Sequence, residues 1–161
     1  MKKNLFMLTV LSILLSVTSI SEGAESKKGF HKIKSDGSYV YYEGSVIVEG
    51  AYHVQVIDDT ISSEYGLVCF SVHGPTERFI PRENDSRSAW FCFTNTAKAR
   101  SALRIPAEVP PDTCIIYGKA TVKISNYVVN RCESECHDEA ILDRVISYEK
   151  PTFRKECNIM P

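Results

Sequence analysis

The chain has 161 residues, 43% of them hydrophobic, and 19 Lys and Arg stand against 20 Asp and Glu, which gives a formal net charge of −1. A near-neutral chain lacks the broad positive field that draws a protein to nucleic acid or to an anionic membrane, so both partner classes are disfavoured. The length suits one compact domain with its own hydrophobic core.

The N-terminus has the pattern of a secretory signal peptide, which we expect to span Met1–Ala24. Lys2 and Lys3 precede an apolar run from Leu5 to Ile20, and small residues follow it. The run is short and is diluted by serine and threonine, which disfavours the alternative of a retained membrane anchor. Cleavage near Ala24 leaves 137 residues, since 161 minus 24 is 137. We therefore expect a periplasmic or secreted protein that is not stably inserted in a membrane.

The mature chain begins with a polar stretch, residues 25–38, that we expect to be a mobile basic arm. From Tyr39 to Val56 apolar side chains recur at even-numbered positions, which predicts a long half-buried strand. Gly44 and Gly50 interrupt this strand, and a glycine within a strand often marks a bulge or a bend. The first predicted element is therefore a long strand that changes direction.

Two shorter strands and a helix are predicted next. In Leu67–His73 the apolar residues Val68, Phe70 and Val72 share one face, and Ala89–Phe93 is rich in aromatic residues, so both segments indicate strands. Thr96–Arg104 contains good helix formers after a capping residue, and Pro106 ends the helix. A charged loop separates the two strands.

Two further strands and a tail complete the chain. Ile115–Val129 and Ala140–Tyr148 are rich in β-branched and aromatic residues, which indicates strands. Residues 151–161 are expected to form a C-terminal tail. The part of the chain that forms the β-fold therefore spans residues 39–150.

The order of three strands, one helix and two strands resembles the OB-fold, a five-stranded, partly open β-barrel. The chain is in this respect similar to small secreted OB-fold proteins of bacteria, and a β-sandwich is the alternative fold. The resemblance implies a ligand across the second and third strands, Leu67–His73 and Ala89–Phe93. It also implies that the loops Asp58–Gly66 and Arg131–Glu139 flank the ligand.

Six cysteines in an exported chain predict disulfide bonds. They are Cys69, Cys92, Cys114, Cys132, Cys136 and Cys157. If the second and third strands pair around Ile80 and Pro81, Cys69 lies opposite Cys92, although either cysteine could instead bond to Cys114 or remain a buried thiol. A second predicted bond joins Cys157 to Cys132 or Cys136.

A metal site is the competing interpretation of Cys132, Cys136 and His137. Thiolate and imidazole ligands at this spacing can hold zinc, but the second closely spaced pair of a zinc motif is missing. We therefore predict disulfides, with no metal and no cofactor.

Five side chains are candidate ligand contacts. Arg78, Arg82 and Arg87 lie in the charged loop, where guanidinium groups could clamp a phosphate or a carboxylate, although acidic residues between them favour a self-paired loop. Trp90 and Tyr127 could stack on a sugar or anchor a partner if they are exposed, or belong to the core if they are not.

The sequence favours a non-catalytic binding module for a protein or carbohydrate ligand, and oligomers are possible. No serine lies in a Gly-x-Ser-x-Gly motif, and no catalytic residues are predicted. One alternative is a periplasmic inhibitor or immunity protein that inserts the loop Thr76–Arg87 into a secreted hydrolase. An enzyme or a metal carrier is the third function class.

Overall fold

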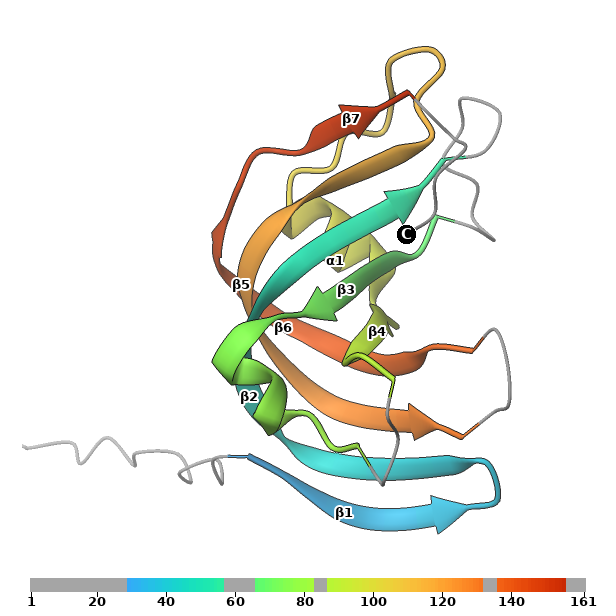
Figure 1. Ribbon diagram of the computed structural model, residues 1–161, viewed down its shortest axis with the longest axis vertical. Coiled ribbons are helices and arrows are strands. Elements are labelled where there is room, and N and C mark those ends of the chain that lie inside the picture. The colour runs from blue at the N-terminus through green and yellow to red at the C-terminus, as the bar shows by residue number, and fades with distance from the viewer. Residues whose placement is uncertain (1–28, 57–65, 83–86, 132–135, 156–161) are drawn as a thin grey trace, which may run out of the picture.

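The computed structural model describes residues 29–56, 66–82, 87–131 and 136–155, which form a mainly β structure (Figure 1). The described elements, in chain order, are β1 (Gly29–Asp36), β2 (Tyr39–Gln55), β3 (Val68–Val72), the 3-10 helix η1 (Gly74–Phe79), β4 (Trp90–Phe93), α1 (Thr96–Ala102), β5 (Ile115–Asn130), β6 (Asp138–Tyr148) and β7 (Thr152–Arg154). Each strand and the helix of the predicted 39–150 unit corresponds to one of them.

The described strands form one seven-stranded sheet in the order β1-β2-β3-β4-β6-β5-β7. An additional pairing of β2 with β5 closes a ring through β2, β3, β4, β6 and β5. The pairs within this ring are antiparallel except for β4 with β6, which are parallel. The mainly β class and the helix after the third ring strand are confirmed. The alternative of a β-sandwich is wrong, because the described strands belong to a single sheet.

The core fills the inside of this ring, because alternate residues of each strand point inward. In β2 the inward positions include Val48, Tyr52 and Val54, which are completely buried. The remaining strands add aromatic and branched side chains, and Leu103, directly after α1, joins the same cluster. Because apolar residues recur at every second position of β2, one face of this strand is buried and the other is not.

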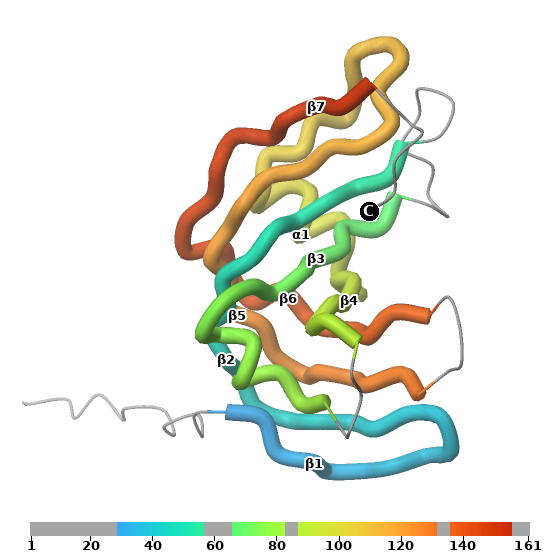
Figure 2. Tube along the Cα trace, in the orientation of Figure 1, coloured from blue at the N-terminus to red at the C-terminus, as the bar shows by residue number. Residues whose placement is uncertain are grey.

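β2 takes part in both halves of the sheet, and Figure 2 shows its strong curvature. Its first half pairs with β1 and its second half pairs with β3, while β5 accompanies it over most of its length. The β2–β5 register shifts between Tyr42 and Ser45, next to Gly44, whose φ is +115°. The predicted irregularity therefore lies at Gly44, and the strand continues through Gly50 without a register shift.

Two segments that were predicted to be irregular form edge strands instead. Most of the expected basic arm is β1, which pairs with β2, and the expected tail contains β7, which pairs with β5. They lie at opposite ends of the molecule (Figure 1). Their polar composition does not have the alternating pattern of a strand, because the residues of an edge strand are mostly exposed. Lysines in such a strand also protect its free edge from pairing with other chains. Phe30 anchors β1 by packing against the Tyr127 ring, 5.5 Å between centroids.

The predicted signal peptide, Met1–Ala24, lies outside the described residues. Among the residues that the structure describes, no helix is long and apolar enough to cross a membrane.

Candidate functional site

The outer surface of β3 and β4 is the face on which the sequence predicted a ligand. The register sets Phe70 opposite Phe91, and both rings are completely buried inside the ring of strands. Because side chains alternate along a strand, Trp90 and Cys92 of β4 point to the outer surface. Trp90 is half-buried there. The alternation therefore places the ring of Trp90 on the outer surface, whereas the ring of its neighbour Phe91 lies in the core.

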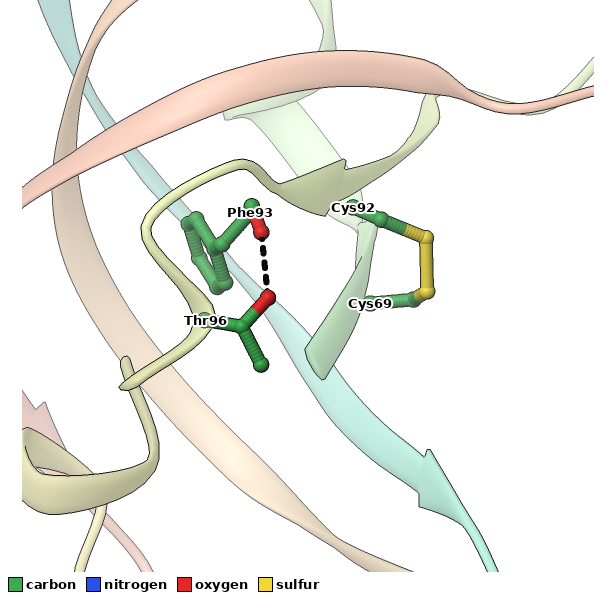
Figure 3. The surroundings of a disulfide bond; sticks show 4 residues. All are labelled: Cys69, Cys92, Phe93 and Thr96. Carbon is green, nitrogen blue, oxygen red and sulfur yellow. Dashed lines mark hydrogen bonds between the residues drawn. A yellow bond between two sulfur atoms is a disulfide. The ribbon is translucent and has the colours of Figure 1, made fainter. Parts of the chain in front are cut away.

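A disulfide joins the two strands on this face (Figure 3). Cys69 of β3 lies directly opposite Cys92 of β4, and the two form a disulfide, as the sequence predicted. Thr96, at the start of α1, donates a hydrogen bond of 2.8 Å to the carbonyl oxygen of Phe93 and fixes the turn that follows β4. The outer face is therefore cross-linked between β3 and β4.

Three rings form a line across this face, which we call the aromatic row: His53 of β2, Trp90 of β4 and His137. The rings of His53 and Trp90 are stacked, with an interplanar angle of 3° and 6.3 Å between centroids. His137 meets Trp90 edge-on, with 5.8 Å between centroids. All three residues are half-buried, so the row combines an apolar surface with imidazole nitrogens that can donate or accept hydrogen bonds.

Burial lowers the pKa of His53 below its ordinary value of 6.5. The unfolded chain therefore binds a proton at His53 more readily than the folded protein does. The free energy of unfolding that neutral His53 contributes is present above pH 6.5 and decreases as the pH falls below that value. We expect acidification from pH 7.5 to 5 to lower the melting temperature less in His53→Gln than in the parent protein. Thermal melts of both proteins and of the exposed control His73→Gln measure this. Equal losses in all three would contradict it.

The second cluster lies where the N-terminal end of β6 meets the C-terminal end of β5, and we call it the Asp138 cluster. Asp138 is only 4% exposed. Its carboxylate accepts hydrogen bonds from the Tyr127 hydroxyl, at 2.7 Å, and from the backbone N–H of Asn130, at 2.9 Å. The guanidinium of Arg87 lies 3.9 Å from the same carboxylate and donates to the carbonyl oxygens of Asn130 and Cys136.

Burial dominates the electrostatics of this cluster. It raises the pKa of Asp138, although the hydrogen bonds from Tyr127 and Asn130 and the charges of Arg87 and Arg82 act to lower it. Burial, together with the neighbouring carboxylate, also holds the pKa of Tyr127 well above its ordinary value. The polar groups of the cluster bond to one another, so the cluster ties the ends of β5 and β6 together.

The structure places the five predicted ligand contacts in four different surroundings. Arg82 and Arg87 act on the Asp138 cluster, and Trp90 lies in the aromatic row. Arg78 is exposed on η1, with its guanidinium 5.0 Å from the centre of the Phe79 ring. Tyr127 is completely buried and belongs to the core, so the interpretation of Tyr127 as an exposed stacking residue is wrong.

His53 was not predicted as a site residue, and His137 was considered only as a ligand of the alternative metal site. The alternation of β2 placed His53 on the outer face, but only the strand register shows that it reaches Trp90 across β3. Of the predicted flanking loop Asp58–Gly66 only Gly66 lies within the described residues, whereas Arg131–Glu139 is described at Arg131 and from Cys136 to Glu139. Within the described part of the chain, no group of three His, Cys, Asp or Glu side chains could hold a metal ion.

Comparisons with protein-family models, with curated proteins and with solved structures find no match for this chain.

The described Cys114 and Cys136 are also disulfide-bonded, whereas Cys132 and Cys157 lie outside the described residues. The Sγ atom of Cys114, before β5, lies 3.3 Å from the carbonyl oxygen of Lys155, whereas Cys136 lies near Asn130 at the other end of β5. Sixteen strand residues lie between these ends, which is roughly 50 Å along the extended chain.

Chain reach therefore predicts bonds from Cys114 to Cys157 and from Cys132 to Cys136. Peptide mass spectrometry without reduction should recover these two pairs together with Cys69–Cys92. A peptide in which Cys157 is bonded to Cys132 or Cys136, the pairing that the sequence alone favoured, would contradict the prediction.

Proposed function

We propose that the protein is a non-catalytic binding module, secreted or periplasmic, that recognises a protein or carbohydrate ligand through the aromatic row. The observation that carries the proposal is the line of His53, Trp90 and His137 on the cross-linked outer face of β3 and β4. The closed ring with one parallel pair and a helix after its third strand supports an OB-type fold. In OB-folds the corresponding face and its flanking loops bind ligands.

A protein ligand is favoured by the residue types around the row. Tryptophan, tyrosine and arginine are enriched among the residues that dominate binding at protein interfaces. Arg87 donates to the carbonyl oxygen of Cys136, beside His137, and the exposed Tyr117 lies in register with His53 on β5. A carbohydrate can use the same half-exposed Trp90 as a stacking platform, and is the second outcome of the test below.

The alternative of a hydrolase inhibitor relied on insertion of the loop Thr76–Arg87 into a partner. The described part of this loop is held against the sheet at three points. Thr76 accepts a hydrogen bond from the Glu49 N–H, Glu77 accepts one from the Ala89 N–H, and Arg87 contacts the Asp138 cluster. These contacts oppose insertion of the loop as a free segment, so the aromatic row is the better supported contact surface.

A capture experiment tests the proposal. The immobilised mature protein, Trp90→Ala and the exposed-helix control Lys98→Ala are each exposed to the extracellular proteins of the producing organism and to a glycan array. We expect a ligand that the parent and Lys98→Ala retain and that Trp90→Ala binds at least about 30-fold more weakly, since hot-spot residues contribute about 2 kcal/mol or more. Equal retention by all three proteins, with Trp90→Ala folded by circular dichroism, would contradict the proposal.

A further inference from the structure

A groove with an apolar wall and a cationic rim lies away from the aromatic row, between η1 and the outer surface of β2, β5 and β6. Its volume is about 510 Å³, within the size range of small-ligand sites. Gly29, Ser45, Val46, Ile47, Phe79, Lys123 and Arg144 line it. η1 packs against β2, and Figure 1 shows this helix beside the middle of the sheet.

The apolar wall consists of side chains that folding leaves partly in water. Ile47 is 46% exposed and Phe79 is 43% exposed, although both are large hydrophobic residues. Because η1 projects Phe79 toward the outer side of β2, the two side chains face one hollow instead of lying as single residues on a flat surface. A ligand that covered them would remove apolar surface from water, which favours binding.

The cationic rim follows from strand register. Lys123 of β5 pairs with Ile47 of β2 on one side and with Arg144 of β6 on the other, so two cations lie side by side next to the apolar wall. Like charges in directly opposed positions are unfavourable without a shared anion. Asp143 lies 3.9 Å from Lys123 and offsets part of this charge, whereas Arg144 is exposed and no described acidic side chain forms an ion pair with it.

Arg78 lies next to the groove without lining it, because its guanidinium is 5.0 Å from the centre of the Phe79 ring. The sequence had identified Arg78 as a candidate contact for a carboxylate or a phosphate, and the structure places it here rather than with Arg82 and Arg87. We propose that this groove binds a small amphiphilic anion, with its apolar chain against Ile47 and Phe79 and its charged head beside Lys123 and Arg144. This site is independent of the aromatic row.

The test uses the mature protein with decanoate as the probe and decyltrimethylammonium, which has the same chain and the opposite charge, as the comparison. Two-dimensional NMR should show saturable shifts for decanoate that centre on Ile47, Phe79 and Arg144. We expect decyltrimethylammonium to bind at least about tenfold more weakly. Arg144→Gln should weaken decanoate binding about threefold or more, as a part-exposed ion pair allows, and Lys98→Gln on α1 should not.

Equal binding of the two amphiphiles, or an unchanged decanoate affinity in Arg144→Gln, would overturn the proposal. So would the absence of saturable shifts, or shifts that centre on His53 and Trp90. Phe79→Ser provides a second variant, because Phe79 is exposed and its replacement spares the core. A decanoate affinity in Phe79→Ser equal to that of the parent protein would also overturn the proposal.

Discussion

Asp138→Ala is expected to lower the free energy of unfolding by about 3–5 kcal/mol, because it removes the acceptor at the centre of a buried polar cluster. The Tyr127 hydroxyl and the Asn130 N–H both lose their hydrogen-bond partner, and Tyr127 is completely buried. The guanidinium of Arg87 loses the carboxylate 3.9 Å away. Urea unfolding followed by circular dichroism measures the change.

Two variants serve as controls for this prediction. Asp138→Asn keeps an oxygen for the Asn130 N–H and a polar group beside Tyr127, so we expect it to cost less than about 2 kcal/mol. Asp143→Ala, on the same strand but half-exposed, should cost less than about 1 kcal/mol. If Asp138→Ala were as mild as Asp143→Ala, the Asp138 cluster would not hold the ends of β5 and β6 together.

Gly44→Ala is expected to cost about 3–5 kcal/mol, because two penalties act at the same residue. The φ of Gly44 is +115°, a conformation that L side chains rarely adopt. A Cβ atom at this position would also collide with the backbone carbonyl of Gly29 in β1. The substitution therefore strains the bulge in β2 and pushes the edge strand away.

Gly37→Ala is the control, because it introduces a side chain at a positive φ without the collision. Gly37 also has a positive φ, +54°, but a Cβ atom there would meet no heavy atom within 4 Å. We expect this variant to cost about 1–2 kcal/mol, the penalty of the left-handed conformation alone. Equal costs for Gly37→Ala and Gly44→Ala in urea unfolding would contradict the close approach of β1 to the bulge.

Local patterns were sufficient to predict the ring strands, because the long strands have one buried face and therefore a clear period, and β3 and β4 are short apolar and aromatic runs buried at nearly every position. β2 and β5 are the clearest cases, with alternate residues buried along most of their length. The same reasoning failed for β1 and β7, whose residues are mostly exposed and carry no such period. An edge strand is defined by its hydrogen bonds to a neighbour, which a single sequence does not show.

The candidate site was only partly predictable for a similar reason. The Cys69–Cys92 pair could be derived from one assumed register, and the structure has that register. Tyr127 and Trp90 look alike in sequence, since both lie in aromatic strands, yet one is completely buried and the other is half-exposed. The aromatic row brings together residues from three distant segments, so it exists only once the ring has closed.

The measurement that tests the binding proposal most directly is the indole N–H signal of Trp90 in a proton–nitrogen NMR spectrum. Trp90 is the only tryptophan in the chain, so the spectrum contains one such signal. When a ligand obtained by capture is added, we predict that this signal shifts or broadens at the same ligand concentration as the signals of His53 and His137. A spectrum in which other residues respond while the Trp90 indole signal stays in place would contradict the proposal that the aromatic row is the binding surface.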